Sequence, residues 1–235
     1  MSRTIKTVST QARALSYALV DPDKLYGSLQ EGLGSWVPLT LLSVATAFVS
    51  YFAIFPVLDV LPRDRTLELT PEQVSQGVDF IRRFRVLMAE LSPLAAVIKW
   101  AVAALLVWMS CLALEVDLKY ERVFRLVVYA SVIPFLHELL KLGLMIYRSR
   151  EASTVMDVVP ATGLNLAFPG SSPPLAALLA SVNIFELWFL VVLAAGVRAL
   201  GPSDTRRAAL AVVPVWVCFT GVQVASAFVG FGGVR

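Results

Sequence analysis

The sequence predicts an all-α integral membrane protein: a five-transmembrane-helix bundle with a short N-terminal arm and an amphipathic helix between the first two spans. The 235 residues are 57% hydrophobic and have a mean hydropathy of +0.74, well above the roughly half-apolar composition of a soluble domain. Only 16% of the residues are charged, and they gather between long apolar stretches. A soluble domain of this length could not bury so much apolar surface. The apolar stretches must therefore face lipid or one another.

The first element is a predicted N-terminal arm, residues 1–34, which we expect to lie against the membrane surface as one or two short helices. Asp21 is a suitable N-cap and Pro22 suits the first helical position. No apolar core followed by a small-residue cleavage site precedes the first span, so we expect that span to direct insertion. The remaining residues, 35–235, form the predicted five-span domain.

Five apolar stretches are each long enough to cross the roughly 30 Å hydrocarbon core, which takes about 20 helical residues. They must be helical because lipid offers no hydrogen bonds to an exposed backbone. The stretches are approximately residues 38–60, 93–115, 123–147, 174–200 and 208–230.

The amphipathic helix is expected between the first two spans. Thr70 is a candidate N-cap, Pro71 follows in the first helical position, and Gln73 completes a capping box. Apolar residues recur after it at spacings of three and four, which predicts a helix along the membrane surface. Ser92 and Pro93 resemble a fresh helix start, so we expect the chain to turn sharply there into the bilayer.

The links between spans predict the orientation of the chain. The second and third spans, and the fourth and fifth, are joined by short links that predict antiparallel hairpins, whereas residues 148–173 are rich in Ser, Pro, Gly and Thr and predict a long loop. Lys119 and Arg122 make one short link basic, and Arg206 and Arg207 make the other basic. The positive-inside rule then favours a cytoplasmic N-terminus and a C-terminus on the outside.

Two stretches of the sequence resemble the Yip1 domain family. The middle span carries a tyrosine and a small residue shortly before a proline, and the fourth span begins with a Phe-x-x-Trp pattern and has a glycine near its exit. The matching residues are Tyr129, Ser131, Pro134, Phe185, Trp188 and Gly196. The five-helix layout and the start at Asp21-Pro22 also fit.

The resemblance implies a five-span bundle with a cytoplasmic N-terminus. Eukaryotic members act in vesicle trafficking and bind Rab GTPases and each other, whereas this chain resembles the short bacterial members. It lacks the long N-terminal region of the eukaryotic members, so Rab binding is not carried over. We expect a multi-pass protein of the bacterial cytoplasmic membrane.

Ionisable residues inside the predicted spans form the candidate site, a buried polar cluster. Such residues are costly in a membrane unless they are paired or reach the interface, and they usually point into the bundle. The cluster consists of Lys99, His137, Glu138, Lys141 and Glu186.

Three interpretations of this cluster stay open. Ion pairing would fix helix register, with Glu138 and Lys141 pairing locally and Lys99 and Glu186 pairing across helices. Alternatively, the cluster forms a proton or ion relay, or a polar substrate site. In a third interpretation Lys99 reaches along its alkyl chain to the membrane interface.

The residues 137–141 read His-Glu-Leu-Leu-Lys and differ by one residue from the His-Glu-x-x-His zinc motif. Lys141 replaces the second histidine, and a lysine cation repels Zn²⁺. We therefore assign no catalytic, cofactor-binding or metal site and expect no enzymatic activity.

The first functional hypothesis is a Yip1-like membrane protein that acts by binding or membrane organisation. Its partners would be membrane lipids, with other membrane proteins or a second copy of this chain as alternatives, and no nucleic acid. The second hypothesis is a small transporter or channel component that uses the Lys/Glu cluster. The first predicts a dry bundle, and the second predicts a hydrated cavity among the charged side chains.

Overall fold

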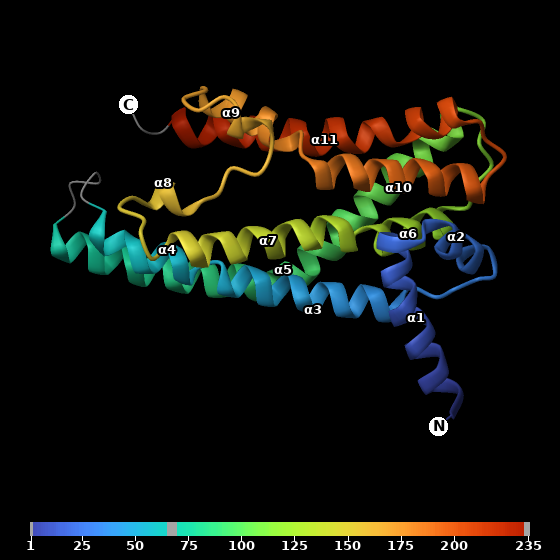
Figure 1. Ribbon diagram of the computed structural model, residues 1–235, viewed down its shortest axis with the longest axis horizontal. Helices are drawn as coiled ribbons and strands as arrows, with labels where there is room; N and C mark the ends of the chain where they lie inside the picture. Colours follow the sequence, from blue (N-terminus) through green and yellow to red (C-terminus); the bar gives the residue numbers. More distant parts are fainter. Residues whose placement is uncertain (1, 65–69, 233–235) are drawn as a thin grey trace. The chain divides into compact units, whose positions relative to one another are not determined.

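The computed structural model describes residues 2–64 and 70–232, and every regular element in these ranges is a helix (Figure 1). The chain forms two compact units. Unit 1 comprises Met1–Thr40, Ile98–Pro134 and Ala161–Arg235, and unit 2 comprises Leu41–Val97 and Phe135–Pro160. The all-α prediction is confirmed.

The helices of unit 1 differ widely in length, from 3 residues in η3 to 28 in α11. They are α1 (Ser2–Val20), α2 (Pro22–Gln30), the start of α3 (Trp36–Phe52), the end of α5 (Pro71–Ala113), α6 (Tyr120–Ala130), the start of α7 (Val132–Arg148), the short 3-10 helix η3 (Leu164–Leu166), α9 (Pro173–Ser181), α10 (Ile184–Leu200) and α11 (Thr205–Gly232). Unit 2 holds the remainder of α3, α5 and α7 with α4 (Phe55–Val60), η1 (Leu61–Arg63) and α8 (Val155–Val158).

Within the described residues, four helical stretches are long and apolar enough to cross a membrane, and a bent helix pair makes a fifth if its two helices count as one span. They are Trp36–Arg63, Ser75–Ala113, Tyr120–Arg148, Thr205–Phe228 and the pair Pro173–Ser181 with Ile184–Leu200. Each overlaps one predicted apolar stretch, but Ser75–Ala113 also takes in the segment before residue 93 that was predicted as a separate surface helix.

The N-terminal arm packs on the helices of unit 1. Asp21 caps α2 by accepting from the Lys24 backbone N–H, as its sequence position predicts. Helix α2 contacts both α6 and α10, while α1 contacts α2 and α6. Leu25 and Leu29 are fully enclosed there. The arm thus completes the packing of unit 1.

The predicted turn at Ser92-Pro93 is wrong. Helix α5 continues through Pro93 for 43 residues, although its start at the Thr70–Gln73 capping box is as predicted. Proline has no N–H to donate to the carbonyl four residues earlier, which is that of Ala89. The Ser92 hydroxyl donates to the Ala89 carbonyl instead, at 2.8 Å. A neighbouring serine can therefore keep the helix intact through a proline.

The fourth span is broken where the sequence predicts one continuous helix. Helices α9 and α10 meet at an angle of 47°. The Asn183 side chain caps α10 by accepting from the Glu186 backbone N–H at 2.9 Å, and it donates to the Ala180 carbonyl at 3.0 Å. One buried amide thus satisfies a backbone group on each side of the break, which lowers the cost of leaving helical geometry inside a span.

Helices α6 and α10 approach closely at Gly196. A Cβ atom at this position would lie 2.5 Å from Cδ1 of Leu126, far inside van der Waals contact. Any side chain here would force the Leu126 side chain to shift, so the glycine makes room for this contact, as small residues do between helices in membranes. The next helix, α11, packs along α10 after a short link, as Figure 1 shows.

Candidate functional site

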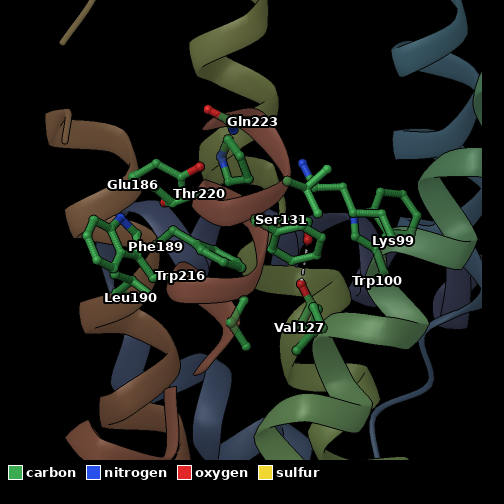
Figure 2. Close-up of a pocket in the computed structure, with 15 residues that line it drawn as sticks. Lys99, Trp100, Val127, Ser131, Glu186, Phe189, Leu190, Trp216, Thr220 and Gln223 are labelled. Atoms are coloured by element: carbon green, nitrogen blue, oxygen red, sulfur yellow. Dashed lines mark hydrogen bonds between the residues drawn. The ribbon is translucent and has the colours of Figure 1, made fainter. Parts of the chain in front are cut away.

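Unit 1 contains a cavity of about 150 Å³, lined by side chains of α5, α6, the start of α7, α10 and α11 (Figure 2). The polar lining residues are Lys99, Ser131, Glu186, Thr220 and Gln223. The apolar wall includes the rings of Trp100, Phe189, Trp216 and Phe219. One buried water needs only ~10–15 Å³, so the cavity has room for several waters or a small ligand.

Lys99 and Glu186 face this cavity from different helices. Figure 2 shows Lys99 extending from α5 and Glu186 from α10 toward the part that Thr220 and Gln223 line. The Lys99 ammonium lies 5.4 Å from the centre of the Phe219 ring, which is cation–π distance. The structure thus brings these two charges to one site, and their direct pairing across helices stays a prediction.

The neutral polar groups of the cavity come mainly from α11. Thr220 is buried, and Gln223 lies one turn further along. Trp216 donates its indole N–H to the Ser181 carbonyl at 3.4 Å, which ties α11 to the end of α9. Helix α11 therefore brings hydrogen-bonding groups to the cavity and is anchored beside the break of the fourth span.

The other three cluster residues belong to unit 2. Glu138 and Lys141 form an ion pair at 2.9 Å, so their predicted local pairing is confirmed. His137 is buried, but Glu138 is exposed, as is Lys99 in unit 1. Burial is therefore not observed for these two residues: Glu138 lies on an exposed face of α7, and Lys99 is exposed although it lines the cavity.

The family-pattern residues of the middle span support the helix packing. Tyr129 is fully buried, and its hydroxyl donates to the Gly34 carbonyl at 2.7 Å, which ties α6 to the chain before α3. Ser131 donates to the Val127 carbonyl at 2.7 Å at the junction of α6 and α7. Pro134 lies in the first turn of α7 and lines the cavity.

The family-pattern residues of the fourth span lie along α10. Phe185 and Trp188 are half-buried in its first turns, just after the Asn183 cap. Gly196, near its other end, is the contact point with Leu126. The pattern therefore follows the start of α10 and its contact with α6.

The arm is held to α10 by two side-chain hydrogen bonds. The Tyr26 hydroxyl donates to the Val192 carbonyl at 2.8 Å, and the Gln30 amide donates to the Ala199 carbonyl at 2.7 Å. Burial raises the pKa of Tyr26 to about 12, and the negative charge of Asp23 contributes in the same direction. The neutral phenol is therefore the form that the docked arm stabilises.

Tyr26→Phe should remove a pH dependence of stability. An unfolded tyrosine ionises near pH 10, whereas folded Tyr26 keeps its proton to about pH 12. The folded state then holds more protons, so its stability is complete below pH 10 and falls as the pH rises to 12. Denaturation in detergent at several pH values should show a steeper decline for the wild type than for the variant. Parallel declines would contradict the role of Tyr26.

Sequence reasoning missed three residues of this region: Asn183, Thr220 and Gln223. The N-cap of α10 had a signal, because asparagine followed by glutamate three positions later is typical of a helix start. Thr220 and Gln223 have no local signal, since isolated polar residues in an apolar span can face lipid, a neighbour or a cavity. Only tertiary packing places them beside Lys99.

Comparison with known proteins is informative at the family level. Searches of curated proteins and of solved structures gave no significant match. The model of the Yip1 domain matches residues 17–226, a range that includes α2 and reaches the last turn of the final candidate span, Thr205–Phe228. The chain is a multi-span membrane protein that belongs to the Yip1 domain family.

Proposed function

We propose that this chain is a non-enzymatic protein of the bacterial cytoplasmic membrane that acts by binding membrane lipids or other membrane proteins. Its N-terminus faces the cytoplasm and its C-terminus faces the outside, as the basic short links favour. Members of the Yip1 domain family are generally non-enzymatic trafficking proteins, which supports a binding role.

The observation that carries this proposal is the use of the family-pattern side chains. The Tyr129 hydroxyl donates to the Gly34 carbonyl, and the Ser131 hydroxyl donates to the Val127 carbonyl. Gly196 leaves room for the Leu126 side chain. Tyr129 and Gly196 join α6 to other parts of the chain, Ser131 satisfies a carbonyl at the end of α6, and none of the three is arranged as a nucleophile beside a base. A family pattern made of packing residues favours a scaffold that presents a surface.

That surface is the apolar exterior of the spans. In unit 1, Leu187 and Val191 of α10 and Val217 of α11 are exposed. Lipid tails are as apolar as these side chains, so close packing and polar contacts, not a hydrophobic driving force, would select a partner helix here.

Photo-crosslinking in living cells tests the proposal. A photoreactive phenylalanine analogue at Leu187 or Val217 should give reproducible discrete adducts with particular lipids or membrane proteins. The matched control is Val215, which lies on the same helix as Val217 but is 1% exposed, against 54%. Equal labelling at Val215 and Val217 would contradict a presented surface.

A transporter or channel component is the second candidate, favoured by the cavity beside a broken span. Discontinuous helices with charges at a cavity are typical of transporter binding sites. Liposomes containing the purified chain decide between the two functions. We expect proton and ion leakage no faster than in protein-free liposomes. Faster flux that Glu186→Gln abolishes in a folded protein would overturn the binding proposal.

A further inference from the structure

We propose that the cavity of unit 1 binds a small zwitterionic group, with an amine held by Glu186 and a phosphate or carboxylate held by Lys99. The inference deepens the proposed binding function and rests on it, because it names the class of ligand. The ligand is either the headgroup of an aminophospholipid or a water-soluble zwitterion of the same chemistry.

The first argument is the arrangement of charge. Lys99 and Glu186 carry opposite charges and line one cavity from α5 and α10. Ionisable residues are expensive in spans, and those that persist there mark binding sites or structural pairs. A ligand carrying both signs of charge complements both residues at once and brings no net charge into the cavity.

Both charged groups retain bonding capacity for a ligand. A lysine ammonium has three N–H donors, and the Phe219 ring occupies one side of the Lys99 ammonium at 5.4 Å. A carboxylate has about four acceptor positions, so Glu186 can accept from a ligand amine in addition to its bonds within the protein.

The position of Glu186 is fixed by the break in the fourth span. Asn183 caps α10 through the Glu186 backbone N–H, which holds Glu186 in the first helical turn. The partial positive charge at a helix N-terminus favours a carboxylate there. Irregular backbone within a span is typically found where it lines a cavity, and here it delivers an acidic side chain to one.

The remaining lining selects for size and polarity. Thr220 and Gln223 add a hydroxyl and an amide that can complete the hydrogen bonds of a charged group. A volume of about 150 Å³ is below the ~300 Å³ at which drug-sized pockets begin, so only a small group fits. Lys99 is exposed, so the cavity reaches the surface of unit 1, where acyl chains could remain outside.

The experiment uses the full chain in nanodiscs and measures retained lipid by native mass spectrometry. Nanodiscs contain phosphatidylglycerol alone or mixed with phosphatidylethanolamine, and glycerophosphoethanolamine serves as the soluble probe. We expect the wild type to retain phosphatidylethanolamine over phosphatidylglycerol. Lys99→Met and Glu186→Gln should each weaken this binding by about tenfold or more, because each leaves one ligand charge unpaired.

The matched controls make the same charge changes on the pair in unit 2. Lys141→Met and Glu138→Gln should leave binding at the wild-type level, because neither residue lines the cavity. Gln223→Leu offers a variant that keeps both charges, and it should weaken binding in a protein that folds even if a charge variant does not. Thermal unfolding of every variant separates lost binding from lost folding.

The outcomes distinguish a lipid headgroup from a soluble zwitterion as the ligand. They also separate failure of the zwitterion site from failure of the broader binding function. Binding of the lipid alone assigns a lipid headgroup, whereas competition by glycerophosphoethanolamine assigns a soluble zwitterion. A wild type that neither discriminates between the lipids nor binds glycerophosphoethanolamine, or folded variants that bind as it does, would overturn the zwitterion site. Discrete adducts at Val217 would still support the broader binding function in that case, whereas Glu186-dependent flux would overturn it.

Discussion

Gly196→Leu should lower the free energy of unfolding by about 3 kcal/mol. A Cβ atom at this position would lie 2.5 Å from Leu126 Cδ1, and a leucine adds three more carbon atoms to that contact. Leu126 is fully buried on α6, and its Cδ1, Cδ2 and Cγ atoms all lie within 3.1 Å of that Cβ position, so the Leu126 side chain must repack or the helices must separate. Overpacking of this kind costs ~1–3 kcal/mol or more. Denaturation in detergent micelles measures the loss.

Gly221→Leu is the matched control, since Gly221 is also helical and a Cβ atom there would meet no atom within 4 Å. It should be neutral or stabilising, because leucine is a better helix former than glycine by up to about 1 kcal/mol. Adding Leu126→Ala to Gly196→Leu should recover part of the lost stability by exchanging the large and small partners. Equal destabilisation by both glycine substitutions would contradict a specific contact at Gly196.

The positions of the spans follow from the sequence because they depend on one physical quantity, the length of an apolar run. Lipid requires about 20 apolar helical residues per crossing, whatever the tertiary structure. The same holds for local signals such as the Asp21 cap and the Thr70 capping box, which involve residues only three apart. Local geometry decides these elements, so the sequence is sufficient for them.

One break and one continuation of the helices were predicted wrongly because each involves the hydrogen bonds of one polar side chain. Ser92-Pro93 has the pattern of a helix start, but the Ser92 hydroxyl satisfies the Ala89 carbonyl and the helix continues. Residues 182–183 lie within an apolar run, but the Asn183 amide satisfies groups on both sides and the helix breaks. At Ser92-Pro93 the local pattern favours a new helix start, and at residues 182–183 it favours a continuous helix. In both places the hydrogen bonds of one polar side chain accompany the opposite result.

The candidate site was predictable only in part, because the sequence indicates its charged residues but not which helices pack together. The cost of charge in a span identifies Lys99 and Glu186 individually, and the local Glu138–Lys141 pair follows from their spacing. The sequence places no constraint on which helices enclose a common cavity. Lys99 and Glu186 are 87 positions apart, and only the packing of α5, α10 and α11 brings them to the walls of one site.

Leu25→Ala should also lower the free energy of unfolding strongly. The substitution tests whether the arm is part of the bundle. Leu25 is 0% exposed and Leu29 is 1% exposed, and α2 packs on α6 and α10. The arm lies outside the candidate spans, so undocking it would expose these side chains to water or the membrane surface. Removing a buried leucine side chain typically costs ~2–5 kcal/mol. Denaturation in detergent micelles should show a loss of this size for Leu25→Ala and for Leu29→Ala.

The matched control is Val20→Ala, at an arm position that is 83% exposed, which should change stability by less than about 0.5 kcal/mol. The sequence of residues 1–34 alone predicts an arm that lies on the membrane surface. In that case all three substitutions would leave the unfolding of the spans unchanged and would instead weaken the binding of the arm to the membrane. If the arm is packed as described, Leu25→Ala should also expose the Tyr26–Val192 hydrogen bond to solvent and reduce the pH dependence that Tyr26 gives the folded chain. Loss of stability and loss of the pH dependence in the same variant would show that α2 supports α10 along its length, and therefore that the arm helps to fix the helix that carries Glu186.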